Sequence, residues 1–333
     1  APAESTDRRV AIPLTVIRHK DVEWNGDNPA LMYGYGSYEM SMDPGFGPAR
    51  LSLLDRGVVY VVAHVRGGGE LGRAWYEDGK KLAKKNSFTD FIDATRFVAS
   101  SGWVHPDKIA AMGGSAGGLL MGGVLNLAPE LYRACVAQVP FVDALTSILD
   151  PDLPLTALEW EEWGNPLEDP QAYAWIRSYA PYEQVRPGVR YPAVLATTSR
   201  NDTRVRFVEP AKWIARLREL APDGGPYLLK TTMDAGHGGA SGRYEAWRER
   251  AFEFAWLDPG SVEPPRLAGA PCSSCGVTVE GTCPFCRAPA QEDEEGLVVH
   301  RGEHVYVVLN LYPYNPGHLL ICPYRHVADY TEL

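Results

Sequence analysis

The sequence predicts an α/β fold, in which helices flank a mostly parallel sheet, followed by a smaller cysteine-rich segment of α+β type. Short apolar runs alternate with helical patterns through roughly the first 250 residues, as in parallel strands joined by helices. The chain of 333 residues is also longer than one hydrophobic core usually serves. The composition of the sequence changes after Leu257, which indicates that the first domain ends there.

Seven runs have the length and apolar character of strands, and four segments have the periodicity of helices. The strand-like runs are residues 11–17, 30–33, 58–65, 109–112, 134–138, 193–198 and 227–231. The helical segments are residues 87–99, 117–126, 210–220 and 242–256. We therefore predict a first domain over residues 1–257, a linker over 258–290 and a second, partial domain over 291–333.

The composition is that of a globular enzyme and excludes several classes of function. The hydrophobic fraction is 45%, no apolar run is long enough to cross a bilayer, and the first residues contain no secretory apolar segment. We therefore expect a cytoplasmic protein without a membrane partner. The net charge of -10 repels phosphates, so nucleic acid is not an expected partner, whereas cationic substrates are attracted.

The acidic residues are concentrated in one stretch between Arg133 and Arg177, which contains eight carboxylates and no Lys or Arg. A run of this kind is either a solvated acidic face or a site for a cation. Composition alone does not decide between the two.

Ser115 is the central residue of a Gly-x-Ser-x-Gly pattern that lies between a strand-like run and a helix-like run. This is the nucleophile elbow of α/β-hydrolases, in which a sharp turn exposes the serine hydroxyl above the sheet. Gly113 and Gly117 allow the turn, and the N-terminus of the next helix points toward the serine. Ser115 is therefore predicted to attack a carbonyl carbon.

A serine nucleophile needs a base and an acid that orients the base, and α/β-hydrolases have them in the order Ser, Asp or Glu, His. Asp202 follows the strand-like run 193–198, and His237 lies in a glycine-rich loop after the run 227–231. His237 is the only histidine between Ser115 and His300. We predict the triad Ser115, Asp202 and His237.

Six motifs together resemble the prolyl oligopeptidase family of serine peptidases, and within it the oligopeptidase B group. The resemblance covers about residues 8–257. The motifs are Tyr33-Gly-Tyr-Gly-Ser-Tyr, His64-Val-Arg-Gly-Gly-Gly-Glu-Leu-Gly, Gly113-Gly-Ser-Ala-Gly-Gly, Gln138-Val-Pro-Phe-Val-Asp, Glu161-Glu-Trp-Gly-Asn-Pro and Gly236-His-Gly-Gly. The family implies an α/β-hydrolase domain that needs no cofactor and forms an acyl-enzyme.

The resemblance also implies two donors to the oxyanion of the tetrahedral intermediate. One is the backbone N–H of Ala116, which follows the nucleophile, as the elbow itself requires. The other is the hydroxyl of Tyr35 in the aromatic and glycine-rich loop after an early strand.

The same resemblance assigns substrate contacts. Glu159 and Glu161 match two carboxylates that receive the Arg or Lys side chain on the acyl side of the cut, so basic peptides are the expected substrates. Asp43 matches one of two aspartates of the preceding subsite, and Gly45 stands where the second is expected. Arg204 matches an arginine that binds a substrate carbonyl in the family.

The family also has a β-propeller that covers the active site, and no such segment precedes Ala1. We therefore expect an open site and an apolar surface that a propeller or an oligomer partner would cover. Two other interpretations remain at this point. The same triad serves esterases and acylaminoacyl hydrolases, and the chain could be an inactive fragment.

The segment after Leu257 contains two Cys-x-x-Cys pairs, formed by Cys272, Cys275, Cys283 and Cys286. In a chain without a secretory segment, such pairs favour a structural zinc over disulfides, with reduced thiols as the alternative.

The last residues resemble the start of a histidine-triad nucleotide hydrolase or transferase, through 309–318 and Pro323-Tyr-Arg-His-Val. In zinc-containing members, one Cys pair and a histidine like His326 are ligands, which competes with a four-cysteine site. The catalytic His-x-His-x-His run of that family is not found in the sequence up to Leu333, so we expect no histidine-triad chemistry. A nucleotide-binding or zinc-binding module is therefore the alternative function from a different class.

Overall fold

The structure is a computed structural model that describes residues 3–4, 10–239, 241–257, 291–292, 298–301, 305–309 and 319–323. It divides the chain into two compact units, Ala1–Val262 and Glu263–Leu333. The division falls shortly after residue 257, where the sequence predicts the first domain to end. The predicted linker 258–290 lies outside the described residues.

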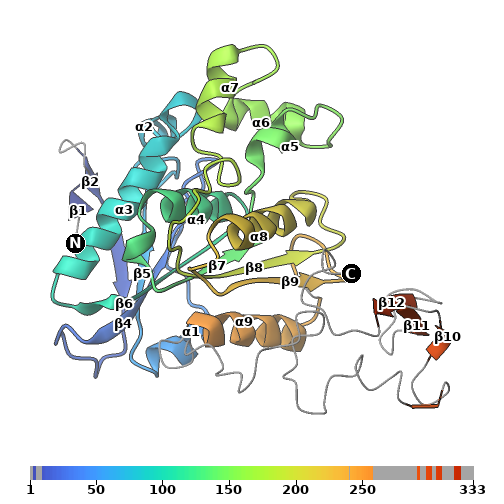
Figure 1. Cartoon of the computed structure of the whole chain (residues 1–333). Helices are drawn as coiled ribbons and strands as arrows, with labels where there is room; N and C mark the ends of the chain where they lie inside the picture. The colour runs from blue at the N-terminus through green and yellow to red at the C-terminus, as the bar shows by residue number, and fades with distance from the viewer. Residues whose placement is uncertain are drawn as a thin grey trace. The chain divides into compact units, whose positions relative to one another are not determined.

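A seven-stranded sheet forms the centre of the first unit, in the order β3-β5-β4-β6-β7-β8-β9 (Figure 1). Neighbouring strands run parallel throughout, except that β3 runs antiparallel to β5. The strands are β3 (Leu14–Ile17), β4 (Asn28–Tyr33), β5 (Val59–Ala63), β6 (Val104–Gly114), β7 (Ala134–Gln138), β8 (Ala193–Ser199) and β9 (Tyr227–Thr232). The predicted mostly parallel sheet of an α/β-hydrolase is confirmed.

The first predicted strand, 11–17, is divided in the structure. β2 (Ala11–Ile12) pairs with β1 (Ala3–Glu4) in a separate two-stranded sheet, whereas β3 joins the main sheet. Pro13 lies between the two pieces and has no N–H to donate to a continuous ladder.

Alternate residues of the central strands pack on opposite faces of the sheet, into two separate hydrophobic cores. In β6, Ile109 and Ala111 belong to the first core, whereas Ala110 and Met112 belong to the second. Because both faces are covered, these strands are apolar on both sides. They therefore occur in the sequence as continuous apolar runs, from which they were predicted.

Helices cover both faces of this sheet (Figure 1). The first core lies under α3 (Lys85–Ser100), α4 (Ala116–Leu127) and α8 (Val208–Leu220). The second core lies under α1 (Pro48–Leu54) and α9 (Arg243–Leu257). The four predicted helices correspond to α3, α4, α8 and α9, with ends within two residues of the expected ones.

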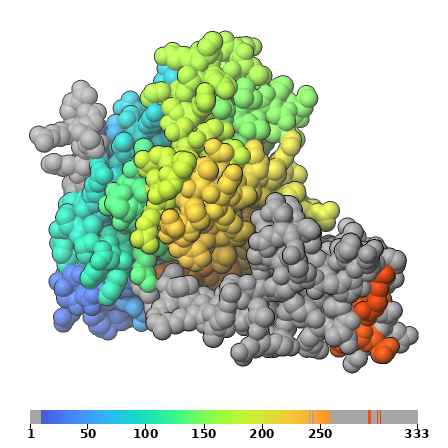
Figure 2. Space-filling view, viewed as in Figure 1, coloured from blue at the N-terminus to red at the C-terminus, as the bar shows by residue number. Residues whose placement is uncertain are grey.

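Seven short helical elements of the described residues were not predicted, because segments of three to eight residues are too short to show helical periodicity. They are α1 (Pro48–Leu54), α2 (Arg73–Glu77), η1 (Lys81–Ala83), η2 (Pro129–Leu131), α5 (Ala144–Ile148), α6 (Thr156–Trp163) and α7 (Pro170–Arg177). The acidic stretch thus contains α5, α6 and α7, which lie together at the top of Figure 1 and form the green surface at the top of Figure 2.

The second unit contains a three-stranded antiparallel sheet in the order β10-β11-β12. Its strands are β10 (Val298–Arg301), β11 (Val305–Leu309) and β12 (Leu319–Pro323). The apolar runs 305–311 and 319–322 of the sequence predict β11 and β12, whereas β10 was not predicted. Within the described ranges of the whole chain, every helix is too short or too polar to cross a membrane.

Candidate active site

The elbow at Ser115 has the geometry that its sequence predicts. Ser115 connects β6 to α4 with φ 56° and ψ -117°, a region that residues other than glycine rarely adopt. Its N–H donates to the carbonyl of Gln138 at 2.8 Å, and its own carbonyl accepts from the N–H of Phe141 at 3.1 Å. The end of β7 therefore holds the strained serine in place.

Gly117 shows why the residue two positions after the serine must be small. A Cβ atom at Gly117 would lie 2.8 Å from the carbonyl oxygen of Gly34 and 3.3 Å from the ring of Tyr35. The elbow is thus packed directly against the loop that follows β4. This close approach brings Tyr35 to the nucleophile.

The structure brings Asp202 and His237 together, although they come from the ends of different strands. The Asp202 Oδ2 atom lies 2.7 Å from His237 Nδ1, and its Oδ1 atom accepts from the N–H groups of Arg204 and Val205, both at 2.9 Å. The carboxylate is buried and has both oxygens occupied. This arrangement fixes the orientation of the imidazole ring.

The pKa of the Asp202 carboxyl lies below its usual value. Burial raises this pKa, but the hydrogen bonds from His237, Val205 and Arg204 lower it by more. Asp202 therefore remains ionised at neutral pH and presents a negative charge to the His237 ring.

Ser115 lies in the walls of two cavities. One, here called the His237 cavity, has a volume of about 280 Å³ and is lined by Ser115 and His237 together with polar side chains of β8, β9 and α9. The other, here called the Glu159 cavity, has a volume of about 380 Å³ and is lined by Ser115, Ala116, Tyr35 and Glu159. The serine thus separates a space that contains the base from a space that can hold a substrate side chain.

Tyr35 and the N-terminus of α4 both lie next to Ser115. The pKa of Tyr35 is raised to about 12, mainly by burial and also by the nearby Glu159, although a hydrogen bond with the Ser115 side chain lowers it. The phenol therefore keeps its proton at neutral pH and can donate a hydrogen bond. Ala116 is the first residue of α4, where backbone N–H groups have no partner within the helix.

Glu159 presents its carboxylate to the cavity beside Ser115. Its Oε2 atom accepts hydrogen bonds from the Tyr38 hydroxyl and from Trp163 Nε1, both at 2.6 Å. The rings of Tyr38 and Trp163 meet edge to face, with centroids 5.8 Å apart. One oxygen is thus held firmly, and the carboxylate lines the cavity beside Ser115.

Glu161 lies elsewhere. Its side chain is 85% exposed and pairs with Lys81 Nζ at 3.2 Å, and it does not line the Glu159 cavity. The two residues are two positions apart in α6, and side chains at that spacing point to different faces of a helix. The joint role predicted for Glu159 and Glu161 stays a prediction.

Asp43 and Arg204, the other two predicted substrate-binding residues, line two different cavities. Asp43 lines a separate cavity of about 370 Å³, together with Arg50 and Arg250, that does not include Ser115. Arg204 lines the Glu159 cavity, next to the loop that carries Asp202. Their predicted roles remain predictions.

Two residues near the site were missed by sequence reasoning. Glu209 lines the Glu159 cavity, is buried, and accepts from the Ser147 hydroxyl at 2.7 Å and the Asp143 N–H at 3.0 Å. Lys84 is buried beside the Tyr35 loop. No local pattern marks Lys84, whereas Glu209 follows two apolar residues at the start of α8, which is a weak signal.

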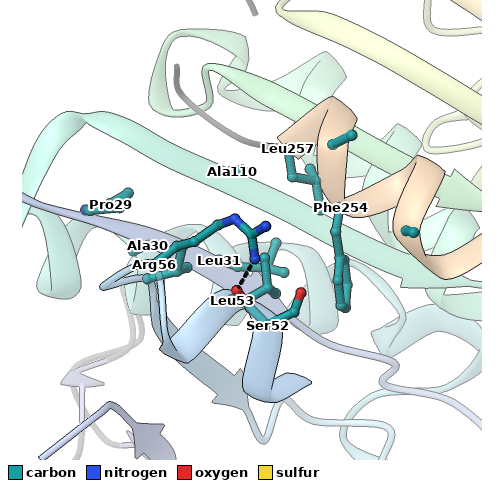
Figure 3. A pocket seen from close by; sticks show the side chains of 12 residues that line it. Pro29, Ala30, Leu31, Ser52, Leu53, Arg56, Ala110, Phe254 and Leu257 are labelled. Carbon is teal, nitrogen blue, oxygen red and sulfur yellow. Dashed lines mark hydrogen bonds between the residues drawn. The ribbon is translucent and has the colours of Figure 1, made fainter. Parts of the chain in front are cut away.

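A further cavity of about 210 Å³ is mostly apolar and contains none of the candidate catalytic residues. It lies among β4, β6, α1 and α9, where Leu31, Leu53 and Phe254 point into it (Figure 3). Arg56 at its edge is tied to the carbonyl of Ser52 by a hydrogen bond of 2.6 Å. We therefore place the reaction in the two cavities beside Ser115.

The candidate zinc ligands cannot be placed in this way. Cys272, Cys275, Cys283, Cys286 and His326 lie outside the described residues. Within the part of the chain that the structure describes, no group of three or more His, Cys, Asp or Glu side chains could hold a metal ion.

The mostly parallel sheet, the strained serine after β6 and the Asp–His pair after β8 and β9 define an α/β-hydrolase. Comparison with known proteins gives the family: residues 44–260 match the model of the prolyl oligopeptidase family. The chain belongs to the prolyl oligopeptidase family.

Similar proteins include peptidases from bacteria and protozoa. Dipeptidyl aminopeptidase BI from Pseudoxanthomonas mexicana is 51% identical over 77% of this chain and 35% of its own length, and protease 2 from Moraxella lacunata is 48% identical over 76% and 37%. The structure of oligopeptidase B from Leishmania major superposes with a TM-score of 0.75 at 45% identity, over 77% of this chain and 35% of that one. The chain thus spans about a third of the length of these relatives.

Proposed function

We propose that this chain is the catalytic part of a serine peptidase that forms an acyl-enzyme. The observation that carries the proposal is the Asp202–His237 pair at 2.7 Å, whose imidazole lines the same cavity as Ser115. Membership of the prolyl oligopeptidase family supports the same conclusion.

In the proposed acylation, Ser115 Oγ attacks the scissile carbonyl carbon, and His237 Nε2 takes the hydroxyl proton. Asp202 accepts the Nδ1–H bond and stabilises the imidazolium. The Tyr35 hydroxyl and the Ala116 N–H donate to the oxyanion. When the C–N bond breaks, His237 returns the proton to the leaving amine. A water molecule then hydrolyses the ester by the same route.

We propose that the enzyme cleaves after Arg or Lys, with Glu159 as the main partner of the cationic side chain. Glu159 is a carboxylate in the cavity beside Ser115, where a guanidinium or ammonium can pair with it. In this proposal Glu161 attracts basic substrates from the rim. Oligopeptidase B from Trypanosoma brucei, 43% identical to this chain over 36% of its own length, was solved with covalently bound antipain.

The test is a series of chromogenic substrates with matched leaving groups and Arg, Lys or Ala on the acyl side, together with an N-acetylalanyl substrate and a simple acetyl ester. We expect kcat/KM for Arg and Lys to exceed that for Ala by at least about 100-fold, the value of one charge-assisted hydrogen-bond pair. Equal rates for all amides would contradict the basic specificity. Hydrolysis of the ester alone would favour an esterase instead.

We also propose that the second unit binds one structural zinc ion through Cys272, Cys275, Cys283 and Cys286, with His326 as a competing ligand. The two Cys-x-x-Cys pairs support this proposal. Metal analysis of the purified chain should find one equivalent of zinc, which the double substitution Cys283→Ser and Cys286→Ser removes. An unchanged metal content in that variant would contradict it.

A further inference from the structure

Lys84 is a fully buried lysine that the proposed reaction does not yet use. Its side chain is 1% exposed, and it immediately precedes α3. The ammonium donates to the Gly36 carbonyl at 2.7 Å, to the Ser37 hydroxyl at 2.8 Å and to Glu162 Oε1 at 3.3 Å. All three of its N–H donors therefore have partners, and these come from two different parts of the chain.

The first two partners belong to the loop that carries Tyr35. Gly36 and Ser37 follow Tyr35 directly, so the bonds to the Gly36 carbonyl and the Ser37 hydroxyl hold the chain just after Tyr35. Gly36 has φ 74°, and a Cβ atom there would lie 2.6 Å from the Val65 side chain. The loop is thus confined between Val65 and Lys84.

The third partner belongs to α6, which carries Glu159. Glu162 is buried, and its second oxygen accepts from the Tyr76 hydroxyl at 2.8 Å. The Lys84 ammonium also lies 4.8 Å from the centre of the Trp163 ring, whose N–H holds Glu159. One ammonium therefore connects two walls of the Glu159 cavity.

Stability alone does not explain a buried ion pair of this kind. Burying two charges costs about as much free energy as their attraction returns, and apolar replacements of similar volume are often as stable. The three directed bonds of Lys84 instead fix the geometry of their partners. Here they fix the loop between the oxyanion position and the substrate cavity.

We propose that Lys84 is a positioning residue, which holds the Tyr35 loop so that the phenol hydroxyl meets the oxyanion formed at Ser115. This inference rests on the proposed peptidase function. Lys84 acts through Tyr35 and does not itself touch the substrate.

The ionisable group that faces Lys84 is Glu162, and the phenols of Tyr76 and Tyr179 interact with Glu162 in turn. Burial lowers the pKa of Lys84 to about 8, while Glu162 raises it. The pKa values of both phenols are raised, mainly by burial, so the phenols stay neutral while Lys84 titrates. A neutral amine has two N–H donors in place of three, so Lys84 can no longer donate to the loop and to Glu162 at all three positions as the pH rises through about 8.

The decisive experiment is a double-mutant cycle with Tyr35→Phe. The combined change Lys84→Met and Glu162→Gln removes both charges, so no buried carboxylate is left unpaired. We expect it to lower kcat on an Arg substrate by about 10- to 100-fold, part of the loss typical of a missing oxyanion donor, with KM changed less than about threefold. In the Tyr35→Phe background, the same change should cost less than about twofold. The neighbouring Lys85→Met serves as the control with unchanged kcat.

Additive losses, or an unchanged kcat, would overturn the inference. A wild-type protein that neither hydrolyses the substrate nor reacts with a fluorophosphonate would instead overturn the proposed function.

The isosteric Glu162→Gln alone gives a second readout, because without the charge of Glu162 the pKa of Lys84 falls. The alkaline limb of kcat/KM, expected near pH 8 in the wild type, should then move to lower pH. A limb that does not move would also overturn the inference.

Discussion

The two sides of Ser115 are built in different ways. On one side, Asp202 and His237 come from loops that directly follow β8 and β9, and the strand ends themselves bring them together. On the other side, the Glu159 cavity depends on contacts between segments far apart in the chain, such as the bond between Tyr38 and Glu159. The comparison indicates that the fold itself assembles the groups of the proposed chemistry, whereas long-range contacts shape the cavity that is proposed to receive the substrate side chain.

This difference predicts that changes on the Asp202 side reduce the rate for every substrate. Asp202→Asn keeps the volume but leaves His237 without its anionic partner and favours the wrong tautomer. We expect kcat/KM to fall by about 10⁴-fold for Arg and Ala substrates alike, the loss typical of this change in a Ser–His–Asp site. Steady-state kinetics at pH 7 to 8 measure it, with the exposed Asp223→Asn as the control.

A change on the Glu159 side should instead distinguish between substrates. Glu159→Gln keeps an acceptor for Tyr38 and Trp163 but removes the charge that faces the substrate. We expect kcat/KM for the Arg substrate to fall by about 10- to 100-fold, the range of a charged hydrogen bond, and that for the Ala substrate to change less than about twofold.

The matched control is Glu168→Gln, an exposed carboxylate of the same acidic stretch. An equal loss for Arg and Ala substrates in Glu159→Gln would remove the contrast between the two sides. It would mean that Glu159 supports the catalytic geometry and does not select the substrate.

The last prediction concerns stability and not activity, and it involves Glu209, the second carboxylate of the Glu159 cavity. Burial raises the pKa of Glu209 to about 7. Between the ordinary pKa of a glutamate and pH 7, the unfolded chain loses this proton before the folded chain does, so stability falls as the pH rises. The size of this contribution is about 3 kcal/mol.

Glu209→Gln should therefore reduce the loss of stability between pH 5 and pH 8, as measured by urea unfolding. Glu183, whose pKa burial also raises to about 7, keeps part of the dependence in the variant. The exposed Glu219→Gln in the same helix is the control. An identical pH dependence in wild type and Glu209→Gln would contradict the buried-carboxylate account.

The same contrast explains how much of the molecule could be predicted from sequence. The order of β6, α4, β8 and β9 and the pairing of Asp202 with His237 follow from rules about strand ends and short loops, so local patterns were sufficient. The helix α6 was not predicted, because eight residues show little periodicity. Because α6 was not predicted, nothing in the sequence indicated that Glu159 and Glu161 point to different faces of a helix.

Buried charges were the hardest to predict. Lys84 and Glu162 are far apart in sequence, and charged residues such as these usually lie on the surface. In the fold the two side chains meet in the interior. Only the three-dimensional packing of α6 against the Tyr35 loop shows that the two charges meet.

The most direct test of the central claim is the rate at which a fluorophosphonate modifies Ser115, followed by mass spectrometry of the labelled peptide. An assembled site predicts one adduct per chain, located on Ser115, absent after heat denaturation and in Ser115→Ala, and formed at least about 100-fold more slowly in Asp202→Asn. A folded protein that gives no adduct, or that reacts equally fast with and without the Asp202 carboxylate, would contradict the account.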